Sequence, residues 1–288
     1  MPHPPRRRLG ASCSLALSLC LVGAACGAPV SQALGVGLAT TPLDGHQAII
    51  GGDYVQGVAA VGLLTTYPSP RNGSLRGECT ATVVSERLVL TAAHCLLARA
   101  HDGADTDQFA SAADISFHLG YNLPAGEAGD RADDFQATDY YLPGGSAFDT
   151  ATFVANIHAG RINDNDLALV VVDHAFAVKP LNVLISPLTP AAVGATLNVV
   201  GFGSTGVAGE SGNGRKRWAQ LSVQDYDDHT LELGSTSSGT CTGDSGGPAL
   251  WGATIVGITQ AGANKDGYCV GSSTFTRLDP YRDFLLGS

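Results

Sequence analysis

Short apolar runs that favour β-strands recur along the chain from Val58 onward, and Gly, Pro, Asn and Asp residues separate them. Many short strands joined by glycine-containing turns are typical of an all-β sandwich or barrel. No interval of ten residues or more shows helical amphipathicity before the C-terminus, where residues 280–286 are expected to form a short helix. The predicted strands are residues 58–66, 81–84, 88–91, 115–119, 167–172, 196–200, 221–223, 254–259 and 273–278.

The N-terminus is predicted to direct export. Three arginines, Arg6 to Arg8, precede an uncharged apolar run at residues 9–25 that ends in small residues. These features define a secretory signal peptide. A transmembrane anchor is the alternative, but the run is shorter than the roughly 20 apolar residues that span a bilayer. We therefore predict a signal peptide over residues 1–26, a pro-segment over residues 27–48, and a secreted, extracellular protein.

Charge and cysteine content narrow the class of protein. The 16 Lys and Arg residues against 26 Asp and Glu residues give a formal charge of −10, which argues against a nucleic-acid partner. Of the seven cysteines, Cys13, Cys20 and Cys26 lie in or at the edge of the predicted signal peptide. The other four suggest two disulfides in an exported protein. Cys26 could instead carry a lipid anchor, because small residues precede it, although Gly23 stands where lipoproteins usually have Leu.

The most informative motif is Gly243-Asp244-Ser245-Gly246-Gly247-Pro248. A serine between glycines can present its hydroxyl outward, because the absent side chains let the backbone turn tightly and expose amide groups. The motif also fits the nucleophile elbow of α/β-hydrolases, in which the catalytic histidine follows the serine. All eight histidines precede Ser245, so a triad of the elbow type cannot be assembled. The chain instead fits the catalytic order His, Asp, Ser.

Two further strings supply the partners of this serine. His94 lies in Thr91-Ala92-Ala93-His94-Cys95, directly after a predicted strand, and Asp166 begins Asp166-Leu167-Ala168-Leu169. Together with Ile49-Ile50-Gly51-Gly52 and the serine motif, they resemble the trypsin-like, chymotrypsin-fold serine peptidases, in the order of that family. The resemblance implies an all-β fold of two six-stranded antiparallel barrels over residues 49–288, with the active site between the barrels.

The resemblance also implies a secreted serine endopeptidase. Ser245 is expected to attack the scissile carbonyl, His94 to accept and return its proton, and Asp166 to hold the imidazole. Backbone amides of Gly243 and Ser245 are expected to form the oxyanion hole. The family pattern assigns the disulfides as Cys79 with Cys95 and Cys241 with Cys269.

Activation by cleavage is a further implication. In the resembling enzymes, a new α-amino group at the position of Ile49 folds inward and pairs with the aspartate before the nucleophile, here Asp244. We therefore expect a zymogen that is cut between Ala48 and Ile49. Neither Lys nor Arg precedes this bond, so a tryptic activator is not expected.

The substrate pocket is expected to accept a neutral residue before the cleaved bond. In trypsin an Asp six residues before the nucleophile attracts Lys or Arg, whereas Gly239 stands at that position here. A range from Ala or Val up to Leu or Phe is expected, and cleavage after Ala48 would suit a self-activating enzyme. Gln260 and Ala261 replace the usual Ser-Trp of the pocket wall. The expected pocket residues are Gly239, Thr240, Gly262 and Ser273.

Two weaker features and one alternative function remain. An acidic segment lies near where some family members bind Ca²⁺; we interpret it as a surface loop, with a structural Ca²⁺ as the alternative and no other cofactor. Residues 215–217, Arg-Lys-Arg, are expected in an exposed loop open to proteolysis. Expected partners of the monomer are protein or peptide substrates and protein inhibitors. The alternative function is a catalytically silent binding module, which the presence of His94, Asp166 and Ser245 disfavours. The calcium candidates are Glu127, Asp130, Asp133 and Asp134.

Overall fold

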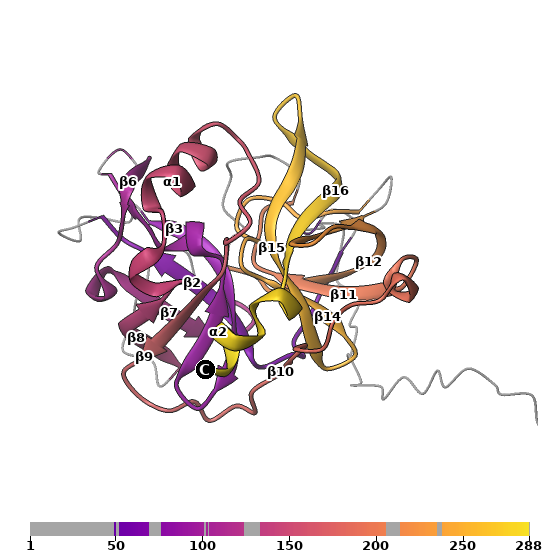
Figure 1. Ribbon diagram of the computed structural model, residues 1–288. Coiled ribbons are helices and arrows are strands. Elements are labelled where there is room, and N and C mark those ends of the chain that lie inside the picture. Colours follow the sequence, from indigo (N-terminus) through magenta and orange to yellow (C-terminus); the bar gives the residue numbers. More distant parts are fainter. Residues whose placement is uncertain are drawn as a thin grey trace, which may run out of the picture. The chain divides into compact units, whose positions relative to one another are not determined.

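Two β-barrels form the described part of the chain (Figure 1). The computed structural model describes residues 49, 52–68, 76–100, 102, 104–123, 133–205, 214–234 and 238–287, which all belong to one unit, Leu34–Ser288. The predicted signal peptide and pro-segment, the Ala48 side of the predicted cut, and the calcium candidates Glu127 and Asp130 lie outside these residues.

The first barrel is a closed ring of six antiparallel strands. All six residues of its strand β2 are buried, and Leu63, Leu90 and Phe117 fill the interior. Apolar residues at these positions leave water when the ring closes, which is the main source of its stability. In ring order the strands are β2 (Val61–Thr66), β3 (Gly77–Ser85), β4 (Leu88–Thr91), β9 (Ala168–Val172), β8 (Asp134–Tyr141) and β7 (Ile115–Leu119).

The second barrel closes in the same way, because β12 pairs with both β11 and β13. Its core contains Leu197, Leu221 and Phe275. Its strands in ring order are β12 (Arg217–Tyr226), β11 (Thr196–Gly201), β14 (Pro248–Trp251), β15 (Thr254–Lys265), β16 (Tyr268–Arg277) and β13 (Thr230–Gly234). Short strands β1 (Asp53–Tyr54) and β10 (Asn182–Val183) add to β12 and β15, and β5 (Leu97–Arg99) pairs with β6 (Asp105–Phe109).

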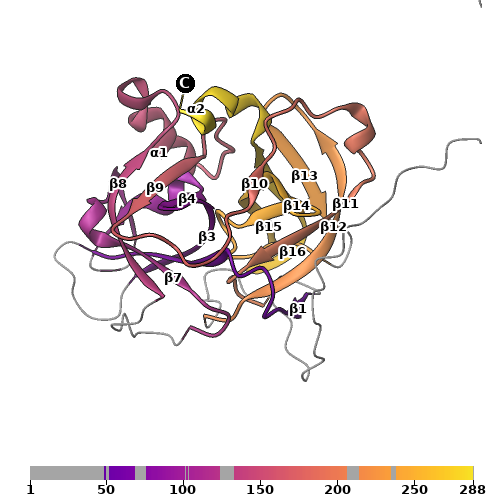
Figure 2. The same ribbon diagram turned by 90° about the horizontal axis from the view of Figure 1, so that it is seen from below.

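The prediction of an all-β, two-barrel fold with a C-terminal helix is confirmed. Helix α2 (Arg282–Leu286) ends the described chain, and Figures 1 and 2 show it beside the first barrel, against whose core Phe284 and Leu285 pack. Among the described residues, no helix is long and apolar enough to cross a membrane.

Between residues 99 and 155 the structure has more elements than the one strand, residues 115–119, that the sequence predicts there. Strand β8 buries Phe135 and Ala137, and polar residues, with Asp139 exposed, interrupt the apolar pattern and hid its alternation. Helix α1 (Thr150–His158) was also not predicted, because its β-branched residues disfavour a helix. The Asp149 side chain caps this helix by accepting a hydrogen bond from the Thr152 amide, and Phe153 is buried beneath it.

The expectation of an exposed basic loop at residues 215–217 is wrong for two of its three residues. Lys216 and Arg217 are buried, at 2% and 3% exposure, because β1 pairs with β12 at this point. The Arg217 guanidinium lies over the Tyr54 ring, and the Lys216 ammonium donates to the Val58 carbonyl at 3.1 Å. Burial lowers the pKa of Lys216 to about 7.

A loop of the second barrel is held against the first barrel through Thr80 of β3. The Thr80 amide donates to the Ser245 carbonyl at 2.8 Å, and its hydroxyl donates to the Gly243 carbonyl at 2.9 Å. Gly246, at φ +77°, lies so close that a Cβ there would stand 2.2 Å from the Thr91 hydroxyl and 2.4 Å from the Thr80 carbonyl. Only glycine fits this contact.

This contact predicts that Gly246→Ala destabilises the protein far more than Gly267→Ala. Both glycines have a left-handed backbone, at φ +77° and +83°, but a Cβ at Gly267 would meet nothing within 4 Å. Both variants carry the strain of alanine in that conformation, about 1–2 kcal/mol. Gly246→Ala adds overlap with the Thr80 carbonyl and the buried Thr91 hydroxyl, so we expect a further loss of at least ~2 kcal/mol in the free energy of unfolding. Urea denaturation of both variants measures the difference, and equal losses would contradict the contact.

Candidate active site

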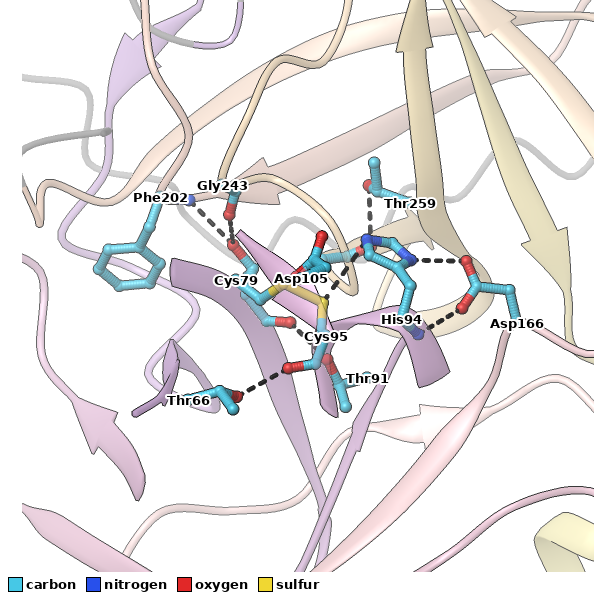
Figure 3. Close-up of a disulfide and its surroundings, with 12 residues drawn as sticks. Thr66, Cys79, Thr91, His94, Cys95, Asp105, Asp166, Phe202, Gly243 and Thr259 are labelled. Atoms are coloured by element: carbon cyan, nitrogen blue, oxygen red, sulfur yellow. Dashed lines mark hydrogen bonds and ion pairs between the residues drawn. A yellow bond between two sulfur atoms is a disulfide. The ribbon is translucent and has the colours of Figure 1, made fainter. Parts of the chain in front are cut away.

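His94 and Asp166 are brought together by the pairing of β4 with β9. Thr91 of β4 stands opposite Ala168 of β9. The turn after β4, which carries His94, therefore lies beside Asp166, two residues before β9 begins. The His94 amide donates to Asp166 Oδ1 at 2.9 Å, and its Nδ1 lies 2.7 Å from Asp166 Oδ2 (Figure 3). A carboxylate only accepts, so Nδ1 carries the hydrogen. Asp166 is completely buried, whereas the His94 side chain is 19% exposed.

The Asp166 carboxylate raises the pKa of the His94 imidazole. Burial alone lowers the pKa of His94, but the charge of Asp166 and its hydrogen bond raise it more, and the net pKa lies above the ordinary value. Asp105 raises this pKa further and Arg99 lowers it, and these two residues pair with each other at 2.7 Å. With Nδ1 committed to Asp166, the neutral ring has its free lone pair on Nε2, which suits a proton acceptor.

The predicted nucleophile lies on the loop that Thr80 fastens to the first barrel. Ser245 is half-buried there, and the neighbouring Gly246 packs against Thr91 and Ala92, the residues that lead to His94. The loop therefore stands next to the turn that carries His94. Gly243, predicted to donate to an oxyanion, has φ +97° on the same loop.

Both predicted disulfides are present, and both adjoin this region. The Cys79–Cys95 bridge crosses from β3 to the turn of His94, and Figure 3 shows His94 between this bridge and Asp166. His94 Nε2 lies 3.8 Å from Cys95 Sγ. The Cys241–Cys269 bridge joins the loop of Ser245 to β16. Each bridge thus limits the movement of one predicted catalytic segment.

Asp244 and Ile49 are both buried in the second barrel. The Asp244 carboxylate accepts hydrogen bonds from the Gly203 amide at 2.8 Å and the Cys241 amide at 2.9 Å. Burial raises the pKa of Asp244 to about 7, against the opposing effect of these amides and of Arg217. Ile49 is 0% exposed within the core of the second barrel. Its peptide bond to residue 48 is intact in this chain, so it carries no α-amino charge.

The predicted pocket residues meet at the end of β15, and two walls of the pocket are in contact. Gly262 pairs with Ser273 of β16, and the Ser273 hydroxyl accepts from the Thr240 amide at 2.7 Å. A Cβ at Gly262 would stand 2.2 Å from the Thr240 carbonyl, so this position admits only glycine. Gly239 lies against the backbone of Val270 and Gly271.

Three further residues make contacts in the site that sequence reasoning did not predict. Thr80 anchors the Ser245 loop, and Thr276 donates from its hydroxyl to the Asp166 carbonyl at 3.1 Å. Neither stands in one of the four family strings. Gln260 hydrogen bonds to Thr276 at 3.1 Å, and its departure from the family's Ser was the one signal that marked it.

The calcium candidates that the structure describes have separate surroundings. The Asp134 carboxylate lies 2.7 Å from His118 Nδ1, and Asp133 is exposed at the start of β8. Within the described residues, one trio of metal-ligating side-chain types comes within 4.8 Å, namely Cys79, His94 and Cys95. The two sulfur atoms of this trio are joined in the disulfide.

Comparisons with known proteins agree with this fold. Thrombin-like enzyme BjussuSP-1 of Bothrops jararacussu is 26% identical over 147 residues, which cover 45% of this chain and 62% of that protein's length. A mutant of human heparin binding protein has a TM-score of 0.61 at 20% identity and covers 83% of this chain and 96% of that one. An inactivated protease paralogue of the scabies mite has a TM-score of 0.56 at 18% identity, with coverages of 85% and 98%.

The structural likenesses, at these identities, show the fold alone. The family model described as Trypsin matches residues 69–285, which is more than half of the chain and includes His94, Asp166 and Ser245. The chain therefore belongs to the trypsin-like serine protease family.

Proposed function

We propose that the chain is a secreted serine endopeptidase that works through Ser245, His94 and Asp166. The observation that carries the proposal is the doubly hydrogen-bonded His94–Asp166 pair, with the Ser245 loop seated beside it. Two disulfides and the N-terminal signal pattern support the export of the protein. Lipid attachment at Cys26 is the alternative fate of that segment.

The mechanism follows from the orientation of the imidazole. As Ser245 Oγ attacks the scissile carbonyl carbon, its proton passes to His94 Nε2, and the carbonyl oxygen becomes an oxyanion. The Gly243 and Ser245 amides are proposed to bind this oxyanion. His94 then protonates the leaving amine, the C–N bond breaks, and an acyl-enzyme remains. Water, deprotonated by His94, releases the acyl group and restores Ser245.

The charge distribution favours this division of roles. Asp166 is buried beside His94 and accepts its Nδ1 hydrogen, so it stabilises the imidazolium that forms during attack. The raised pKa of His94 makes it a stronger base, and below that pKa the imidazolium cannot accept a proton. Activity is thus expected to rise with pH through the pKa of His94.

A test of the triad uses a fluorophosphonate probe on the protein purified from the culture medium. Wild type should be labelled at Ser245, and Ser245→Ala should show no labelling. Asp166→Asn should lower kcat by about 10⁴, because the imidazole then loses its carboxylate partner. His158→Ala, an exposed histidine on α1, is the control and should retain activity. A properly folded wild type that is cleaved at Ile49 and still unlabelled would favour the alternative of a catalytically silent binding module.

We further propose that the chain is a precursor activated by cleavage between Ala48 and Ile49. In the uncut chain, Asp244 has neutral amide donors and its pKa is raised, which indicates that its charge is incompletely compensated. The Thr240 carbonyl also lies against Gly262, so these two predicted pocket residues are closely packed in the uncut chain. A new α-amino group at Ile49 would supply a positive charge, and we propose that the loop then rearranges and separates the pocket walls.

The raised pKa predicts a distinct pH dependence of precursor stability. Between pH 4 and 7 the folded precursor retains a proton on Asp244 that the unfolded chain releases, so this stabilisation is present at low pH and is lost as pH rises through about 7. In a Ser245→Ala background, urea unfolding should show about 2 kcal/mol lost from this source between pH 5 and pH 7.

Asp244→Asn in the same background should lack this component of the pH slope. Cleaved protein, with its N-terminus at Ile49 verified by Edman sequencing, should also lack it, because an α-amino partner keeps Asp244 ionised. Identical slopes for the precursor and its Asp244→Asn variant would refute the assignment.

The activated enzyme is proposed to prefer a neutral residue before the cleaved bond, because the pocket positions carry no charged group. Peptide p-nitroanilides with Ala, Leu or Phe should be cleaved with a kcat/KM at least about tenfold above that for Arg, since an unpaired cation is costly to bury. Gly239→Asp should raise cleavage after Arg if this residue faces the pocket. Preference of the wild type for Arg would disprove the neutral pocket.

A further inference from the structure

Gln260 stands at an irregularity of β15 that redirects its side chain. Thr259 pairs with Phe275 and Ala261 pairs with Thr274, so Gln260 is the extra residue of a β-bulge. Bulges near active sites commonly re-aim one side chain. Gln260 is only 7% exposed, so its amide must find partners within the protein.

The amide finds its partners on the segment that leads to Asp166. Gln260 Nε2 donates to the Asn163 carbonyl at 2.6 Å, and its Oε1 accepts from the Asn163 amide at 3.3 Å. Both backbone groups of Asn163, three residues before Asp166, are thereby bound by one side chain. A glutamine carries a donor and an acceptor at its end, and this site uses both.

A second route reaches Asp166 directly. Gln260 Nε2 also donates to Thr276 Oγ1 at 3.1 Å, and Thr276 in turn donates to the Asp166 carbonyl at 3.1 Å. The donor directions agree along this chain, because the Thr276 oxygen accepts one hydrogen and gives its own. Thr276 and Asp166 are both 0% exposed, so water does not compete for these bonds.

Helix α1 is joined to the same network. Asn163 Nδ2 donates to the Phe153 carbonyl at 3.3 Å, and Asn163 Oδ1 accepts from Asn156 at 3.0 Å. The segment before Asp166 is thus held on one side by α1 and on the other by Gln260. Of these contacts, Gln260 alone comes from β15, whose next residues form the predicted pocket wall.

We propose that Gln260 is the positioning residue of Asp166 and links the substrate-binding strand to the His94–Asp166 pair. The inference rests on the proposed peptidase function. The Gln260 amide holds Asp166 through Asn163 and Thr276, and loss of this amide lets Asp166 turn away from His94.

The test compares activated full-length variants in which the network is cut at two points. Gln260→Met keeps the length of the side chain without its polar atoms, and Thr276→Val removes the hydroxyl but keeps the shape. Both should lower kcat about tenfold or more, with a smaller change in KM. Both should also move the acid limb of the pH–rate profile to lower pH, because a looser Asp166 raises the pKa of His94 less. Asp105 and Arg99, which also face His94, are unchanged in these variants.

Two controls separate positioning from general stability. Gln136→Met removes another glutamine that bridges backbone carbonyls, those of Ala112 and Ile115, in the first barrel. It should lower stability without moving the pH profile. Thr276→Ser keeps the hydroxyl and should behave as wild type. A Gln260→Met enzyme whose pH profile and kcat match those of Gln136→Met would overturn the proposal.

A separate measurement distinguishes failure of this inference from failure of the proposed function. Titration of the His94 imidazole by NMR in the Ser245→Ala chain, with and without Gln260→Met, needs no turnover. A lower pKa of His94 in the double variant is expected. An unchanged value would reject the positioning role even in an enzyme that the fluorophosphonate labels, whereas an unlabelled wild type with its N-terminus at Ile49 rejects the peptidase function alone.

Discussion

The rest of the site depends on one constraint: two fully buried carboxylates must find their hydrogen-bond donors within the protein. Asp166 and Asp244 are both completely buried, and a buried ionised carboxylate is tolerated only where hydrogen-bond donors or positive charge replace its lost water. Asp166 receives the amide and the imidazole of His94. Asp244 receives the amides of Gly203 and Cys241. Each carboxylate therefore fixes the backbone of a segment distant in sequence.

The two barrels provide the rigidity that these hydrogen bonds need. The pairing of Thr91 with Ala168 places His94 beside Asp166. Because the barrel is closed, the register between these two strands cannot shift. Thr80 of the first barrel fixes the position of the second barrel's Ser245 loop, because its amide and hydroxyl donate to carbonyls of that loop. Gly246 allows the approach. Small changes at the contact of the barrels thus act on the relative position of His94 and Ser245.

The sequence predicted the parts of the structure that are encoded locally. The strands of the barrels that alternate cleanly, the short string around His94, and the order of His94, Asp166 and Ser245 were all visible without coordinates. Strand β8 and helix α1 were missed because carboxylates and β-branched residues gave the wrong local signal, and burial of Phe135 and Phe153 decides their fold instead. The role of Gln260 was not predictable, since it depends on a bulge that redirects one side chain.

The two buried aspartates differ in what can change their state. Asp166 already has His94 as a partner that can become positively charged, and Thr276 donates to its backbone carbonyl. Its environment therefore needs no change for it to function. Asp244 has neutral donors and the field of Arg217, and burial still raises its pKa to about 7. A positive charge placed beside Asp244 would therefore stabilise its ionised form. Ile49 is buried in the same barrel, and the cleavage that we propose before it would create such a charge. This is why we propose a regulatory role for Asp244 and a catalytic role for Asp166.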